Sequence, residues 1–293
     1  MSDASQMSDH VKGLLLTSAG VLLVVPDSLF VRLIDGDPIV TAFWRALFSG
    51  VIILAGVWFL MGANGFKAVF RTGWRGWLYI CLMGSTAPGF VLAVSNTSVA
   101  NVVFILASMP VFAVLFSRIF LKEPITRRMT LTIAAVLVGL GVLALGSHTQ
   151  AAASWKGDLW ALYVSVVFAG ALTLVRQLKS VSMVPALPIA FLGTALALAP
   201  FGAPLATFAM DWPLYLAHGG FIGVSACLLA LGPRYILPAE AALLILLESI
   251  LAPLLVWAVL GEDPGGYPLL GGTIVIGTLI VSNMIALRRP AYP

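Results

Sequence analysis

Four ionisable side chains interrupt long apolar stretches of this 293-residue chain: Asp27, Arg45, Glu240 and Glu248. A charge surrounded by hydrocarbon costs roughly 3 kcal/mol or more unless it is paired or hydrated, so each is a candidate for binding an ion, a proton or a polar ligand group. A rise of about 1.5 Å per residue puts Asp27 and Arg45 at similar depths in neighbouring helices, which predicts a salt bridge. That pair would either lock the two helices together or take part in gating.

Glu248 lies near the middle of the apolar run 238–260. Its carboxylate could bind an ammonium group or a proton, and the alternative is a protonated side chain that is hydrogen-bonded within a helix bundle. Glu240 follows Pro238 at the start of the same run, so helix capping or snorkelling to the interface is the better interpretation.

The other reactive side chains form no motif of an enzyme or a metal centre. His10, His148 and His218 are scattered without metal-ligand spacing, and no nucleotide-binding P-loop is present. Cys81 and Cys227 lie within apolar runs, where cysteine usually packs as a small apolar residue. We therefore expect no enzyme activity, no cofactor and no metal, although an integral-membrane enzyme remains an alternative class.

The elements that carry these residues are membrane helices. Hydrophobic residues make up 60% of the chain and charged residues 10%, and the apolar residues form runs of about 20, the length a helix needs to cross a bilayer. The sequence predicts an all-α integral membrane protein with ten spans, at residues 12–33, 38–61, 74–95, 98–120, 128–146, 157–178, 185–207, 213–236, 238–260 and 267–287.

Basic residues predict the orientation of these spans. With the amino terminus in the cytoplasm, thirteen Lys and Arg residues fall on the inner side, and only Arg32 and Lys156 fall on the outer side. This bias is typical of the positive-inside rule and predicts that both termini are cytoplasmic. It also explains the basic net charge without a nucleic-acid partner.

The chain contains an internal repeat. A shift of 139 positions aligns 98–123 with 237–262, so that Glu123 pairs with Glu262, and it aligns Gly84 with Gly223. We divide the chain into 1–147 and 148–293, each with five spans. An odd number of spans inverts the second copy relative to the first, as in secondary transporters.

Short motifs recur in order along both halves of the chain: Ala42-Phe43-Trp44-Arg45, Met109-Pro110-Val111-Phe112, Leu121-Lys122-Glu123-Pro124, Leu247-Glu248-Ser249 and Leu260-Gly261-Glu262. With these motifs the sequence resembles the drug/metabolite transporter superfamily, and specifically its EamA-type exporters. In the second copy, Ser249 stands where these exporters often have proline, and Asp263 follows Glu262.

This resemblance implies an alternating-access exporter of small amphipathic metabolites in the bacterial inner membrane, with a central pathway lined by helices from both halves. YddG-like exporters of aromatic amino acids are similar in size and layout, which favours amino acids as the cargo. A multidrug or other metabolite carrier is the first alternative, and a channel is the second. Whether transport is facilitated or coupled to protons is left open by the resemblance.

Polar and aromatic residues at helical spacing are candidates for lining the pathway. For Trp160 and Tyr163, anchoring in an interfacial aromatic belt is the alternative. The candidate substrate-binding residues are Tyr79, Met83, Ser85, Asn101, Ser108, Trp160, Tyr163 and Glu248.

Glycine and proline within the spans indicate bends or close packing. Gly84, Pro88, Pro110 and Gly223 are candidate hinges, and helix packing is the alternative for each. Small residues four apart in 135–139 and 273–277 suit close helix contacts at the periphery or a homodimer interface through the fifth and tenth spans. The chain is otherwise expected to be a monomer.

Overall fold

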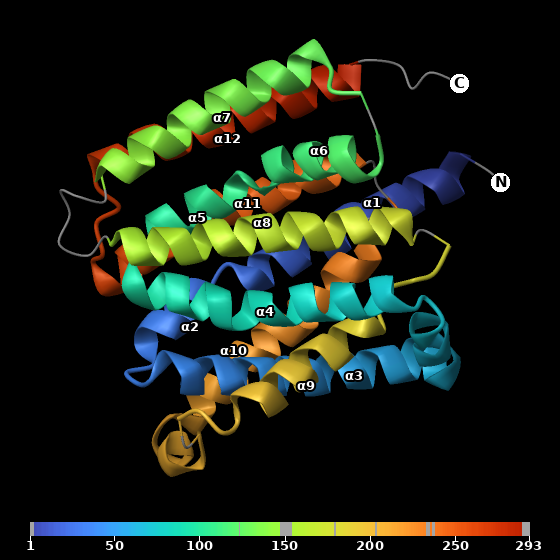
Figure 1. Ribbon diagram of the computed structural model, residues 1–293, viewed down its shortest axis with the longest axis vertical. Helices are drawn as coiled ribbons and strands as arrows, with labels where there is room; N and C mark the ends of the chain where they lie inside the picture. The colour runs from blue at the N-terminus through green and yellow to red at the C-terminus, as the bar shows by residue number, and fades with distance from the viewer. Residues whose placement is uncertain are drawn as a thin grey trace.

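The computed structural model describes residues 3–122, 124–146, 154–178, 180–202, 204–232, 235 and 238–288. These residues form helices and contain no strand. The long helices run roughly parallel to one another in a thick slab (Figure 1). Their bounds are α1 Asp3–Val24, α2 Asp27–Leu33, α3 Pro38–Phe70, α4 Trp74–Asn96, α5 Val99–Ala107, α6 Met109–Phe120, α7 Arg127–Gly146, α8 Trp155–Gln177, α9 Ala186–Leu198, α10 Pro204–Leu231, α11 Pro238–Leu260 and α12 Gly266–Arg288.

Eight helical segments among the described residues are long and apolar enough to cross a membrane. They correspond to all the predicted spans except 185–207 and 238–260. In these two regions the structure has shorter apolar helices, Ala186–Leu198 and Leu244–Leu260 within α11. The predicted seventh span, 185–207, is too long, because α9 ends at Leu198. Gly202, with φ +136°, has a non-helical backbone and separates α9 from α10, which starts at Pro204.

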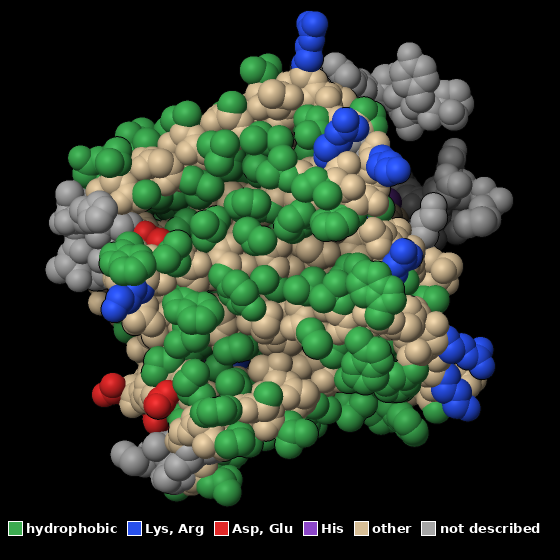
Figure 2. Space-filling view, in the orientation of Figure 1, with side chains coloured by type: hydrophobic (Ala, Val, Ile, Leu, Met, Phe, Trp, Pro, Cys, Tyr) green, Lys and Arg blue, Asp and Glu red, His purple; other side chains and the backbone are tan. Residues whose placement is uncertain are grey.

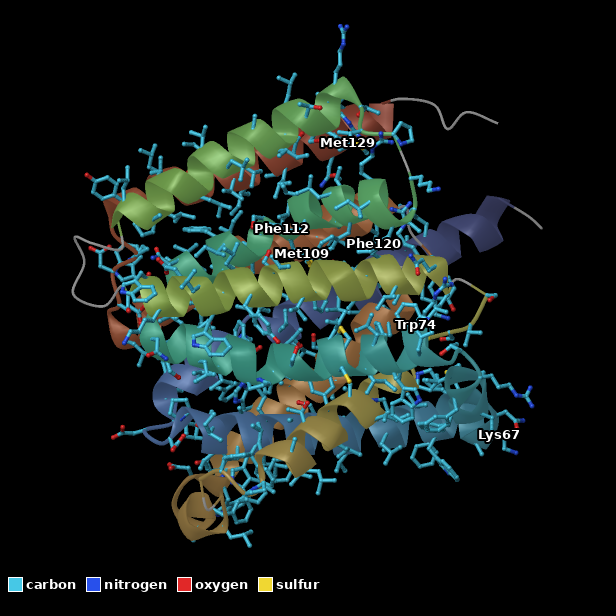
Figure 3. All side chains as sticks on the ribbon, viewed as in Figure 1. Lys67, Trp74, Met109, Phe112, Phe120 and Met129 are labelled. Carbon is cyan, nitrogen blue, oxygen red and sulfur yellow. The ribbon has the colours of Figure 1, made fainter. Side chains whose placement is uncertain are left out.

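Two predicted spans contain a break in the helix, and a third break lies just beyond the end of another span. α1 ends at Val24, and α2 begins at Asp27, immediately after Pro26. The span 98–120 divides into α5 and α6 at Ser108, and Met109 lies midway along the bundle (Figure 3). Gly62, with φ +59° and ψ −166°, interrupts α3 next to the predicted span end at 61. The breaks at Pro26 and Ser108 place helix ends inside the bundle, and backbone groups at helix ends have no partner within the helix and can bind polar groups.

The largest hydrophobic core surrounds α5, in which every residue except Leu106 is buried. α5 packs against α8, α11 and α12, and α7 lies along α12 at the edge of the slab (Figure 1). A methyl group on Gly139 of α7 would lie 2.9 Å from the Gly271 carbonyl oxygen of α12. The small residues of these two helices therefore serve a close contact within one chain.

The aromatic residues divide between the surface and the core. Trp74 is 68% exposed, near the same end of the slab as Lys67, as Figure 3 shows. Trp44 is buried and packs against Phe208, Phe48 and Tyr215. Trp44 therefore helps to hold α3 against α10 inside the protein, whereas Trp74 is placed as an interfacial residue.

Candidate functional site

Asp27 and Arg45 form a buried bidentate ion pair. Arg45 donates from Nε to Asp27 Oδ1 at 2.9 Å and from Nη2 to Oδ2 at 2.6 Å. The break at Pro26 places Asp27 in the first turn of α2, where free backbone N–H groups favour a carboxylate. The predicted salt bridge is thus present, and its role in gating stays a prediction.

His218 of α10 is a third member of this site. Its Nε2 lies 2.6 Å from Asp27 Oδ1, and its side chain is completely buried. A carboxylate that is paired with arginine accepts hydrogen bonds only, so Nε2 carries the hydrogen and donates it. Phe30 stacks on the imidazole with ring centroids 5.5 Å apart.

His218 was not among the residues predicted to form a site, because the histidines were considered only as metal ligands. His218 and Asp27 are 191 positions apart. The available signal was the position of His218 inside a predicted span, where any titratable group is a functional candidate.

Glu248 completes what we call the central ion cluster: Asp27, Arg45, His218 and Glu248. The half-buried carboxylate of Glu248 is close enough to interact electrostatically with both Asp27 and Arg45. Phe90 of α4 packs under the Arg45 guanidinium, 5.3 Å from its ring centroid. Side chains from α2, α3, α10 and α11 therefore converge on one charged centre with aromatic neighbours.

Three candidate pathway residues on α4 lie elsewhere. Tyr79 and Met83 are buried in a hydrophobic core with Ala171 of α8 and Ala190 of α9. The Ser85 hydroxyl donates to the Leu82 carbonyl of its own helix at 2.8 Å. These contacts favour packing for the three residues in the conformation described.

Asn101 and Ser108 connect α5 to α8. Asn101 donates from Nδ2 to Asp158 Oδ1 at 3.1 Å. The Ser108 hydroxyl, at the break between α5 and α6, donates to the Ile105 carbonyl at 2.6 Å and lies 3.4 Å from the Ser165 hydroxyl. Ser108 is therefore the better placed of the two for a ligand at the break.

Trp160 and Tyr163 are each 39% exposed, with their rings edge to face at 5.7 Å. Tyr163 also packs beside Gly89 of α4. This position suits either the belt or the pathway, so both interpretations stay open.

Polar contacts close one end of the bundle, which we call the Arg32 end. Arg32 pairs with Glu262, Nε to Oε2 at 2.9 Å, and donates to the Thr97 carbonyl at 2.8 Å. Glu262 Oε1 accepts the Val99 N–H at 2.9 Å, at the start of α5, and the Thr97 hydroxyl donates to Asp158 at 2.8 Å. These bonds join the ends of α2, α4, α8 and α11.

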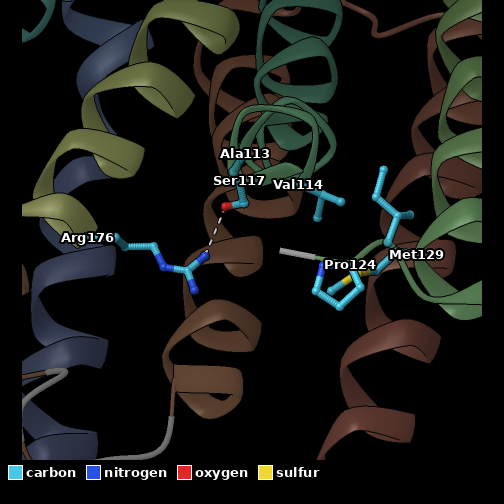
Figure 4. Close-up of a pocket in the computed structure, with 7 residues that line it drawn as sticks. Ala113, Val114, Ser117, Pro124, Met129 and Arg176 are labelled. Carbon is cyan, nitrogen blue, oxygen red and sulfur yellow. Dashed lines mark hydrogen bonds between the residues drawn. The ribbon is translucent and has the colours of Figure 1, made fainter. Parts of the chain in front are cut away.

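The opposite end carries the basic residues and a small pocket. Figure 2 shows most of the visible Lys and Arg side chains gathered at the side opposite the acidic ones. Arg176 donates to the Ser117 hydroxyl at 3.0 Å beside a pocket of about 100 Å³ (Figure 4). Small-molecule sites usually occupy about 300–1,000 Å³, so this pocket is too small for the expected cargo.

The candidate hinges occupy different settings. Gly84 and Gly223 are buried at helix crossings, Pro88 lies inside the continuous helix α4, and Pro110 lies in the first turn of α6. Only Pro110 adjoins a break. Glu123 and the side chain of Glu240 lie outside the described residues.

The parallel apolar helices and the buried charges define an α-helical multi-pass membrane protein. Residues 11–145, a little under half of the chain, match the sequence model of the EamA-like transporter family. A protein of known crystal structure resembles the whole chain, with a TM-score of 0.60 at 17% identity, covering 99% of this chain and 100% of that one. This likeness shows the fold alone. No curated protein matches the sequence.

Proposed function

We propose that this protein is an alternating-access carrier of ten spans, built from two inverted five-helix repeats, that exports small amphipathic metabolites across the bacterial inner membrane. Amino acids, including aromatic ones, are the leading substrate class. The central ion cluster carries this proposal, because it holds four ionisable groups where helices from both halves meet.

Helix contacts support the inverted repeat. In the proposed repeat, α1 and α2 correspond to α8, α3 to α9, α4 to α10, α5 and α6 to α11, and α7 to α12. Contacts between the two halves should then include equivalent pairs. α4 packs on α8 and α10 on α1; α10 packs on α3 and α4 on α9. Contacts between equivalent helices also occur, as between α3 and α9, α5 and α11, and α7 and α12. This pattern is expected of a pseudo-twofold axis.

Charge distribution supports the proposed orientation. Most of the visible basic side chains gather at the side opposite the acidic ones (Figure 2), and α2, which carries Arg32, lies at the acidic side (Figure 1). The positive-inside rule therefore favours a periplasmic Arg32 end and cytoplasmic termini. The Arg32–Glu262 ion pair then ties helices at the periplasmic end. An export cycle requires these contacts to open after the cargo has entered from the cytoplasm.

The composition of the central ion cluster supports a cargo with an ammonium group. Asp27 is neutralised by Arg45, whereas no hydrogen bond joins the Glu248 carboxylate to another described residue. Glu248 is therefore placed to bind a cation, and Phe90 and Phe30 provide apolar surface near it for an aromatic side chain.

Counterflow in proteoliposomes tests the proposal. Vesicles loaded with unlabelled phenylalanine are expected to take up external labelled phenylalanine transiently above equilibrium, and N-acetylphenylalanine, which lacks the ammonium group, should not compete. Glu248→Gln should lose at least tenfold in apparent affinity, whereas Asp263→Asn, at the end of the bundle, should retain it. Equilibration without overshoot would indicate a channel, and overshoot with lipophilic cations alone would indicate a multidrug carrier.

A further inference from the structure

We propose that His218 is the proton-binding residue of a proton/substrate exchange carried out by the central ion cluster. This inference rests on the proposed transport function and adds its coupling ion. It assigns a role to His218, a buried imidazole that no sequence motif had marked as functional.

The two ring nitrogens of His218 have different surroundings. Nε2 donates to Asp27, so in the neutral imidazole Nδ1 carries a lone pair. Nδ1 is buried and has no hydrogen-bond partner among the described residues. A buried acceptor without a partner is unfavourable, which suits a group that receives a hydrogen or a proton during the cycle.

Charges on the neighbouring helices determine what a proton on His218 would do. Asp27 of α2 attracts an imidazolium and Arg45 of α3 repels it, and Glu248 of α11 interacts with both. When Asp27 and Glu248 are ionised and His218 is neutral, the cluster has a net charge of −1. One positive charge balances it, either a proton on His218 or the ammonium group of the cargo, so the two compete.

The proton step needs no other reactant. On the periplasmic side, Nδ1 forms an N–H bond with a proton given up by hydronium, which leaves as water. The new imidazolium keeps its bond to Asp27 and removes the electrostatic reason for the cargo to stay near Glu248. On the cytoplasmic side, the proton returns to water as the next ammonium group binds. Inward proton flow would thus drive export.

A pH gradient across proteoliposomes tests this exchange. With an interior one pH unit more acidic than the bath, a one-for-one exchange permits about tenfold accumulation of labelled phenylalanine, measured with the membrane potential clamped at zero. The wild type and the matched control His10→Gln are expected to accumulate label. His218→Gln is expected to show slower counterflow and no accumulation above the equal-concentration level.

Two results would overturn the assignment. One is accumulation by His218→Gln equal to that of the wild type. The other is a wild type that shows counterflow but neither accumulates label nor releases protons when phenylalanine is added in weak buffer. The second measurement does not depend on folding of the variant. Absence of counterflow in the wild type would instead remove the proposed transport function.

Discussion

Gly84 of α4 and Gly223 of α10 each lie at a tight helix crossing, Gly84 against α9 and Gly223 against α3. A methyl group on Gly84 would lie 2.6 Å from Thr194 Oγ1 and 3.0 Å from the Ala190 carbonyl oxygen of α9. A methyl group on Gly223 would lie 2.8 Å from Ile52 Cβ and 3.2 Å from the Ser49 carbonyl oxygen of α3. The proposed inverted repeat would relate these two crossings, because the 139-residue shift aligns the two glycines.

Alanine at either glycine should destabilise the protein. Gly84→Ala and Gly223→Ala each force backbone atoms of a neighbouring helix to move, at a cost of about 1–3 kcal/mol. Thermal unfolding in detergent measures the loss. The control is Gly141→Ala in α7, where no atom lies within 4 Å of the added methyl group; it should be neutral or more stable by about 0.5–1 kcal/mol. Unchanged stability with impaired transport would instead support a hinge.

Removal of one charge from the buried ion pair should be costly. Asp27→Asn leaves Arg45 buried without its counter-ion and is expected to cost about 3–5 kcal/mol. The double variant Asp27→Asn/Arg45→Met removes both charges and should be more stable than Asp27→Asn. Thermal unfolding of Asp27→Asn, Arg45→Met and the double variant gives the coupling energy between the two charges. Additive losses would show that the pair contributes little as a unit.

The Arg32–Glu262 ion pair should stabilise closure of the Arg32 end, the proposed periplasmic end. Glu262→Gln weakens the bond to Arg32 and the cap on Val99, at a cost of about 1–2 kcal/mol. A cysteine at Thr97 should then react faster with a membrane-impermeant thiol reagent in a Cys81→Ala/Cys227→Ala background. Asp35→Asn, an exposed carboxylate at the same end, serves as the control. Equal labelling rates in both variants would argue against a lock.

The inverted repeat predicts opposite locations for two aligned residues. Single cysteines at Glu123 and Glu262, in the same cysteine-free background, should be labelled from the cytoplasmic and periplasmic sides, respectively. Labelling of right-side-out and inverted membrane vesicles with an impermeant reagent distinguishes the two sides. If both positions reacted from one side, the two halves would share an orientation, and ten spans would be the wrong number.

Much of the local structure followed from the sequence, because hydrophobic length is a local property of the chain. Eight spans, the end of the second span beside Gly62 and the salt bridge between Asp27 and Arg45 were predicted. The salt bridge could be predicted because its partners lie on consecutive spans, so counting residues from the turn between these spans gives their relative depth.

Tertiary packing decided the remaining features. His218 and Asp27 form a contact although they are 191 positions apart in the sequence, and Arg32 contacts Glu262 across 230 positions. Neither contact leaves a trace in hydropathy, which records the burial of a segment but not the neighbours of one face. The same limit applies to Tyr79 and Met83, because hydropathy does not indicate that they pack in a hydrophobic core; their role in a pathway stays a prediction. Segment length and charge bias determined which parts enter the bilayer, whereas helix crossings determined which charges meet there.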